Sequence, residues 1–194
     1  MKTLSMTRPL VLITCVLALG ACSPTQSIEL AGPWSAEFEA AYEEAGDPFV
    51  RGVLEDGVVT DQEYAEMFEA FSSCMAAVGV TLREAPEADG GGISYTFPDS
   101  VTADEAHEAE VRCSSESGEY PIGALYHMVR RNPENLDEHE IVWECMIAQK
   151  IVAASYSIED FARDWDESTL PFAGDETASE AFRMCVNDPL GLLG

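Results

Sequence analysis

Four of the cysteines form two matched pairs along the chain, and this spacing is the strongest constraint on its fold. Cys74 precedes Cys113 by 39 residues, and Cys145 precedes Cys185 by 40. A methionine follows the first cysteine of each pair, and Ala-x-Glu-Ala-x-x-x-Cys ends at the second cysteine of each. We interpret this as an internal duplication, with chance similarity in an Ala/Glu-rich chain as the alternative. Each copy is then a Cys-Met helix, a connector and a helix that ends near cysteine.

The start of the chain has the pattern of an export signal. Lys2 and Arg8 are followed by an apolar run from Pro9 to Leu19, which is shorter than the roughly 20 residues of a membrane-spanning helix. Leu19-Gly20-Ala21-Cys22 closes this run and resembles the lipobox of bacterial lipoproteins. The resemblance implies cleavage after residue 21 and a diacylglyceryl group on the Cys22 sulfur. An ordinary secretory signal is the alternative, in which the cysteine is a coincidence.

The leader divides the chain into three parts. Residues 1–21 are the expected signal peptide, and residues 22–33 are a short polar tether. Residues 34–194 are expected to form one globular domain, with repeats at about 60–118 and 136–188. Two or more acyl chains at Cys22 would anchor this domain stably in the membrane. We therefore expect a protein on the extracytoplasmic face of the cell membrane, with membrane lipid as its first partner.

An exported chain favours disulfides over free thiols. Cys15 lies in the leader and Cys22 is assigned to lipid, which leaves four cysteines and three possible pairings. The repeat selects Cys74–Cys113 and Cys145–Cys185. A zinc site is the competing use of four cysteines, but zinc ligands usually come in pairs two to four residues apart, and this chain has none.

Apolar periodicity predicts a mainly α-helical fold with a small β-hairpin. The hairpin is expected at residues 80–84 and 93–97 around a glycine-rich turn. Thr60-x-x-Glu63 and Thr102-x-x-Glu105 each predict a capping box at the start of a helix. Other helices are expected at about 34–45, 48–55, 137–153, 157–165 and 176–187.

The charge balance restricts the partners. The leader holds two of the ten basic residues and none of the 36 acidic ones, so the remainder has a formal charge of −28. Such a surface repels phosphate backbones, which excludes nucleic-acid binding, and it disfavours electrostatic adhesion to anionic lipid headgroups. A solvated acidic exterior is the simplest interpretation. Capture of cations or of basic partners is the alternative.

No set of catalytic residues stands out. His139-Glu140 begins a zincin-like motif, but Trp143 replaces the second histidine. There is no Gly-x-Ser-x-Gly nucleophile elbow, and the four cysteines are assigned to disulfides. Carboxylates near Phe161 and Trp165 could serve a glycan or peptide hydrolase, and this is the alternative function. The carboxylates are Glu159, Asp160, Asp164, Asp166 and Glu167.

The mature chain also resembles uncharacterised lipoproteins of actinobacteria. The resemblance is carried by Leu54-Glu55-Asp56-Gly57, Glu63-Tyr64 and Cys74-Met75, and it brings no activity, cofactor or metal with it. We therefore expect a non-catalytic interaction module with a protein partner in the envelope. The seam between the two disulfide-linked halves is the expected ligand groove.

Overall fold

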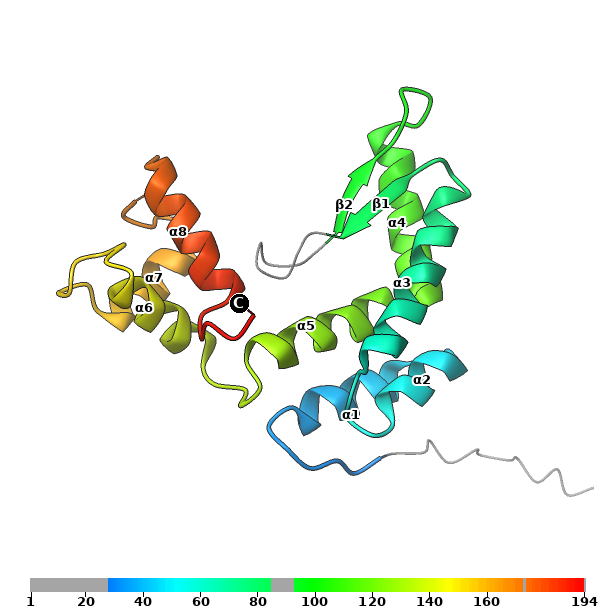
Figure 1. Ribbon diagram of the computed structural model, residues 1–194, viewed down its shortest axis with the longest axis horizontal. Helices are drawn as coiled ribbons and strands as arrows, with labels where there is room; N and C mark the ends of the chain where they lie inside the picture. Colours follow the sequence, from blue (N-terminus) through cyan, green and yellow to red (C-terminus); the bar gives the residue numbers. More distant parts are fainter. Residues whose placement is uncertain (1–27, 85–92, 173, 194) are drawn as a thin grey trace, which may run out of the picture.

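Two groups of helices, each held by one disulfide, make up the structure (Figure 1). The computed structural model describes residues 28–84, 93–172 and 174–193. The expected fold class is confirmed, since the chain is mainly helical with one antiparallel hairpin. The expected glycine-rich turn at residues 88–92 lies outside the described residues.

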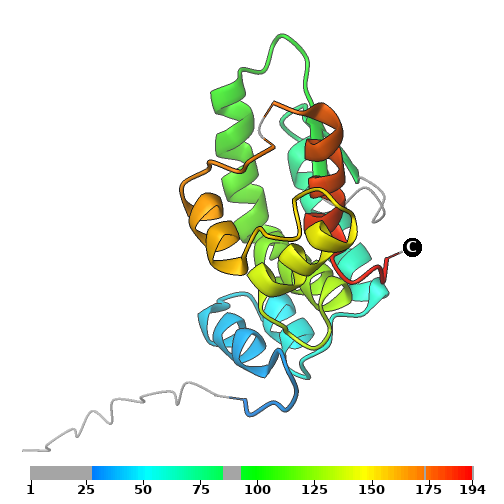
Figure 2. The same ribbon diagram turned by 90° about the vertical axis from the view of Figure 1, so that its left-hand side faces the viewer.

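The N-terminal half contains five α-helices, the hairpin and one π-helical turn. In chain order these are α1 (Ser35–Glu44), α2 (Pro48–Leu54), α3 (Asp61–Ala76), β1 (Thr81–Glu84), β2 (Ile93–Thr96), α4 (Ala103–Ser117), η2 (Glu119–Gly123) and α5 (Ala124–Arg131). In Figure 1 the α1–α2 pair lies at the lower end of the N-terminal half and the hairpin in its upper part, and in Figure 2 the α1–α2 pair again lies below the other helices.

Local sequence signals fix the starts of the two long helices of this half. The side chain of Thr60 accepts from the backbone N–H of Glu63, and Thr102 does the same for Glu105. Both capping boxes are complete, as predicted. The helix α3 then buries Met67, Phe71 and Met75 completely, so its apolar stripe forms the centre of the N-terminal core.

The C-terminal half is smaller and consists of α6 (Glu138–Ala148), α7 (Ile158–Asp166) and α8 (Glu176–Asn187). Its own hydrophobic cluster is separate from the N-terminal one. The buried members of this cluster are Ile141, Val142, Met146, Phe161 and Cys185. Asp137, Ser157 and Asp175 cap the three helices through their side chains.

Two details of the C-terminal half differ from the prediction. The helix expected at 137–153 ends at Ala148, because Lys150 adopts a left-handed conformation (φ 60°) and Ile151 N–H donates to the Met146 carbonyl. Ala148 is therefore exposed rather than facing inward. Trp165, expected in the core beside Phe161, is 39% exposed.

Both predicted disulfides are formed. Cys74–Cys113 joins α3 to α4, and Cys145–Cys185 joins α6 to α8. The Cα atoms lie 5.7 and 5.6 Å apart, which is the usual separation for a disulfide. Each bond therefore links the two helices of one predicted repeat.

The two Cys-Met helices end in the same turn, which the sequence analysis did not identify. Val80 N–H donates to the Met75 carbonyl at 3.1 Å, and Ile151 N–H donates to Met146 at 3.0 Å. The residue before each donor is left-handed, Gly79 in one half and Lys150 in the other. The two halves thus share backbone geometry over Cys-Met-x-x-x-x-apolar.

A second turn is also shared and follows the last helix of each half. Leu136 N–H donates to the Asn132 side chain, and Leu192 N–H donates to Asp188 in the same way. Each acceptor precedes a proline and ends a helix, α5 and α8 respectively. This turn comes directly after the disulfide helix α8 in the C-terminal half. In the N-terminal half, η2 and α5 intervene.

The residues at the end of α5 join the halves. Arg131 pairs with Glu138 at the start of α6, and its Nε donates to the Val186 carbonyl of α8. The buried Trp34 Nε1 donates to the Asn132 carbonyl at 2.8 Å. The C-terminal half is therefore attached through the hydrogen bonds of Arg131, while the bond from Trp34 holds the end of α5 near α1.

Candidate functional site

A hollow of about 640 Å³ lies between α1 and the α4–η2–α5 segment. Its wall is largely apolar and includes Ala41, Ala45, Val50, Val111, Leu125 and Met128. This hollow lies inside the N-terminal half, whereas the sequence predicted a groove at the seam between the two halves. The difference arises because α1, which precedes both repeats, borders the same space as α4 and α5.

The π-helical turn η2 separates this hollow from a smaller one. Gly118 ends α4 in a left-handed conformation (φ 74°), and Pro121 has no N–H with which to extend the helical ladder. Tyr120 is left 76% exposed on this turn. Tyr120 and Ala124 line both the larger hollow and the smaller hollow of about 230 Å³. Turns of this kind are frequent at functional sites.

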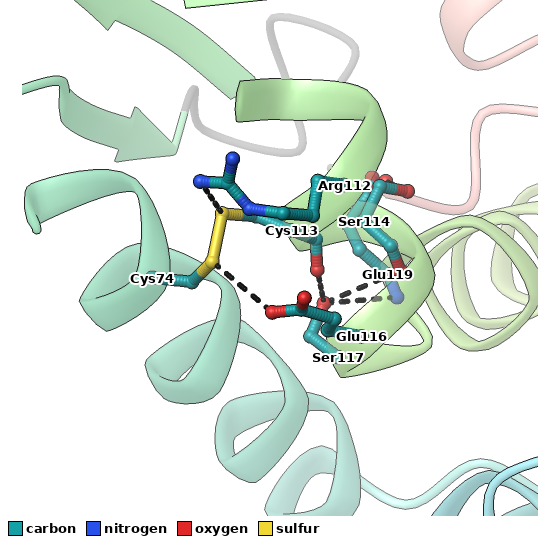
Figure 3. Close-up of a disulfide and its surroundings, with 7 residues drawn as sticks. All are labelled: Cys74, Arg112, Cys113, Ser114, Glu116, Ser117 and Glu119. Carbon is teal, nitrogen blue, oxygen red and sulfur yellow. Dashed lines mark hydrogen bonds between the residues drawn. A yellow bond between two sulfur atoms is a disulfide. The ribbon is translucent and has the colours of Figure 1, made fainter. Parts of the chain in front are cut away.

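The first disulfide lies next to this turn (Figure 3). Cys113 and the residues after it are connected by short side-chain bonds: Ser117 Oγ donates to the Cys113 carbonyl at 2.8 Å, and Glu119 N–H donates to Ser117 Oγ. Ser114 Oγ donates to the Glu119 carboxylate at 2.7 Å. The disulfide therefore holds α4 against α3, and the serines hold η2 on α4.

Carboxylates surround the two hollows. Glu37, Glu44 and Asp47 border the larger hollow and Glu119 the smaller one, and among the described residues neither lining includes lysine or arginine. Glu37 Oε1 accepts from Asn135 Nδ2, but within the described part of the chain its buried Oε2 has no hydrogen-bond partner. The site is thus an apolar surface with an acidic edge.

Tyrosines form much of the smaller hollow. Tyr64 Oη lies 3.2 Å from His127 Nε2, and the Tyr64 ring stacks on Tyr126 with centroids 4.1 Å apart. Burial, reinforced by a hydrogen bond with Glu84, raises the pKa of Tyr64 well above the ordinary tyrosine value. The phenol stays protonated at neutral pH, so this wall of the hollow is aromatic and uncharged.

Two of the five carboxylates proposed for a hydrolase, Asp160 and Asp164, are engaged in local bonds instead. Arg163 pairs with Asp160 and with Asp164, and Tyr156 Oη donates to Asp164 at 2.9 Å. The hydrogen bonds from Arg163 and Ser157 lower the pKa of Asp160. A glycosidase acid requires a raised pKa, whereas the pKa of Asp160 is lowered. These bonds therefore stabilise helix α7 and do not prepare Asp160 to donate a proton.

The histidines are dispersed. His107 is exposed on the surface of α4, with its Nδ1 atom 3.4 Å from a carboxylate oxygen of Glu110. His139 packs edge-on against Phe161 and Trp165. Over the described ranges 28–84, 93–172 and 174–193, no three His, Cys, Asp or Glu side chains are grouped so as to hold a metal ion.

Sequence reasoning did not identify the site around Tyr120. The exposed Tyr120-Pro121 and the preceding glycine were the available signals, but the opposing wall comes from α1, more than sixty residues earlier. Cys22 and the leader lie outside the described residues. In the part of the chain that the structure covers, no helix is both long and apolar enough to cross a membrane.

Comparison with known proteins adds no assignment. No family model matches the chain, and no curated protein or solved structure matches it.

Proposed function

We propose that the protein is a lipid-anchored binding module of the bacterial cell envelope, and that it acts without catalysis. The lipobox-like segment Leu19-Gly20-Ala21-Cys22 supports the anchor and the location. The hollow beside Tyr120 supports the binding role and is the observation that carries the proposal. Its volume is that of an ordinary ligand pocket, and its wall is apolar with a few polar groups.

The position of this hollow in the repeats is further support. The shared Asx-Pro turn begins at Asp188, three residues after Cys185, but in the N-terminal half η2 and α5 (residues 119–131) intervene before it. These two elements supply much of one wall of the larger hollow. The two disulfide-linked helix pairs act as the scaffold in this proposal, and the inserted segment carries the contact surface.

The anchor is tested on the mature protein from its own cells. The amino-terminal peptide should begin at Cys22 and carry the mass of a diacylglyceryl group, and Cys22→Ala should leave the leader uncleaved. An unmodified Cys22 would contradict the anchor without affecting the binding role.

The binding role is tested with a photoreactive phenylalanine analogue placed at Tyr120 in living cells. The matched control carries the analogue at Met184, which is 62% exposed on the C-terminal half. We expect one stoichiometric protein adduct at position 120 and none at position 184. Absence of an adduct at position 120, or equal labelling from both positions, would contradict the proposed module.

A further inference from the structure

We infer that the partner of the Tyr120 surface is a cationic peptide segment carrying a bulky apolar side chain. The apolar side chain enters the larger hollow, and flanking lysines or arginines lie along its acidic edge and over Tyr120. This inference rests on the proposed function as a binding module and names the class of partner.

The wall of the hollow requires an apolar group. Val111 and Met128 border it and are 59% and 39% exposed, so two large apolar side chains face solvent at one site. Ala41 and Ala45 on α1 present only methyl groups across the space, which leaves room for an incoming side chain. Covering such a surface with an aliphatic or aromatic group removes apolar area from water.

The edge of the hollow selects the charge of the partner. Glu37, Glu44 and Asp47 border the apolar wall, and no basic side chain of the described residues lines it. A second copy of the mature chain has a formal charge of −28 and would bring like charge to the edge. An acidic peptide or an anionic headgroup would be repelled in the same way. A segment rich in lysine or arginine has the complementary charge.

One group at the edge is suited to receive a cation. Tyr120 is exposed and borders both hollows, so its ring offers a cation–π position between them. A basic group of the partner would lie against this ring.

The test measures binding of a short fluorescent peptide of Lys, Leu and Phe to the purified mature chain by anisotropy. Two probe controls replace every Lys with Gln, or every Leu and Phe with Ser. We expect only the parent peptide to bind, and to bind more weakly as salt rises, because exposed charges are screened. Equal binding of the Gln peptide would overturn the cationic assignment, and equal binding of the Ser peptide the apolar one.

Matched variants of the protein locate the binding. Glu37→Gln with Glu44→Gln removes two charges at the hollow, while Glu159→Gln with Glu176→Gln removes two exposed charges from the C-terminal half. The Glu37→Gln substitution keeps a side-chain oxygen that can accept from Asn135 Nδ2. The first pair should weaken peptide binding about tenfold, and the second pair should weaken it less than about twofold. Equal weakening by both pairs would mean diffuse attraction and overturn the inference.

The two proposals fail separately. If no peptide binds but position 120 still gives an adduct in cells, the partner belongs to another class and the inference is wrong while the binding module stands. If the adduct is absent but the peptide binds in a manner that depends on Glu37 and Glu44, the surface has the inferred specificity and the proposed partner in the envelope is wrong.

Discussion

The two halves are built on the same pair of disulfide-linked helices but bury very different amounts of apolar material. Among the described residues, the N-terminal cluster has seventeen buried members, from Trp34 to Leu125, and the C-terminal cluster has five. Both disulfides close loops of nearly equal length, with separations of 39 and 40 residues. The disulfide contribution is therefore about the same in each half, while the hydrophobic contribution is not.

This difference shows how a small helical unit stays folded. A large core tolerates the loss of one constraint, whereas a few buried side chains offset the chain entropy only with the disulfide in place. The larger core also includes side chains of the inserted η2 and α5. The half with more buried apolar residues is therefore the one that carries the proposed contact surface.

Removing each disulfide tests this comparison most severely. A loop of about 40 residues corresponds to about 4 kcal/mol in the chain-entropy treatment. We expect Cys145→Ala with Cys185→Ala to unfold the C-terminal half, and Cys74→Ala with Cys113→Ala to leave the N-terminal half folded at lower stability. The indole N–H signals in NMR spectra report on each half, because Trp34 lies in one and Trp143 and Trp165 in the other.

The same spectra test whether the halves fold together. If Cys145→Ala with Cys185→Ala also removes the folded signal of Trp34, the junction at Arg131 and Asn132 couples the halves into one cooperative unit. If the Trp143 signal survives in that variant, the C-terminal core is sufficient alone, and the comparison of cores is wrong.

Substitution at Gly118 should produce the next largest effect. Its φ is 74°, and a β-carbon there would overlap the Val50 side chain. We expect Gly118→Ala to lower the free energy of unfolding of the N-terminal half by about 2–4 kcal/mol, from backbone strain together with overpacking. Urea unfolding followed by the fluorescence of Trp34 in a Trp143→Phe, Trp165→Phe background measures it.

Gly174→Ala is the matched control in the C-terminal half. Gly174 also has a positive φ of 96°, but a β-carbon there meets nothing within 4 Å. This variant should lose only the backbone part, about 1 kcal/mol, in urea unfolding followed by the indole N–H signal of Trp143. Equal losses at the two glycines would show that the contact with Val50 is readily relieved and that α2 does not constrain η2.

Local signals made much of the scaffold predictable from the sequence. A capping box needs only Thr60 and Glu63, and the two strands flank a glycine-rich stretch of sequence, so each element is predictable from a few neighbouring residues. The disulfides span about 40 residues, yet Cys74–Cys113 was predictable because Cys145–Cys185 repeats its spacing. The end of α6 was not predicted, because Lys150 occupies a left-handed position at which glycine is the usual residue.

The candidate site was not predictable in this way. Its two walls come from α1 and from η2 with α5, and no periodicity links residues so far apart. The exposure of Tyr120 depends on where the ladder of α4 stops, which Gly118 and Pro121 decide together. The scaffold thus follows from local signals, whereas the site follows from tertiary packing.

Above about pH 10, the free energy of unfolding of the N-terminal half should fall more steeply with pH than that of the C-terminal half. Burial raises the pKa of Tyr64 and of Tyr95 in the first, and burial with a hydrogen bond to Asp164 raises the pKa of Tyr156 to about 12 in the second. Unfolded tyrosine ionises near pH 10, so these groups stabilise the folded chain below that pH, and their contribution is lost above it. Two such groups act in one half and one in the other.

The measurement is urea unfolding at several pH values above about 10, followed by the indole signals of the two halves. We expect the free energy of unfolding reported by Trp34 to fall by more per pH unit than that reported by Trp143, and Tyr64→Phe to reduce the difference. Equal slopes would indicate that alkaline destabilisation is set by general charge repulsion, to which the many carboxylates contribute.

Exchanging the left-handed residues of the shared turn gives the smallest and most specific test. Gly79 and Lys150 occupy equivalent positions with φ of 85° and 60°. Lys150→Gly relieves strain of about 1–2 kcal/mol but adds freedom to the unfolded chain, so we expect a net gain of about 0.5–1 kcal/mol. Gly79→Lys should cost a similar amount, since a β-carbon there meets only Val101 at 3.5 Å.

Gln149→Gly separates these two terms, because Gln149 precedes Lys150 and has right-handed φ and ψ of −78° and −5°. It adds the same freedom to the unfolded chain without relieving strain, and should destabilise the C-terminal half by about 0.5–1 kcal/mol in urea. Destabilisation by both Lys150→Gly and Gln149→Gly would show that Lys150 adopts its turn at no cost. In that case the Met146–Ile151 bond is held by the packing of α6 against α8. The C-terminal half would then retain the geometry of the N-terminal turn through tertiary contacts, even though its sequence has lost the glycine that produces this geometry locally.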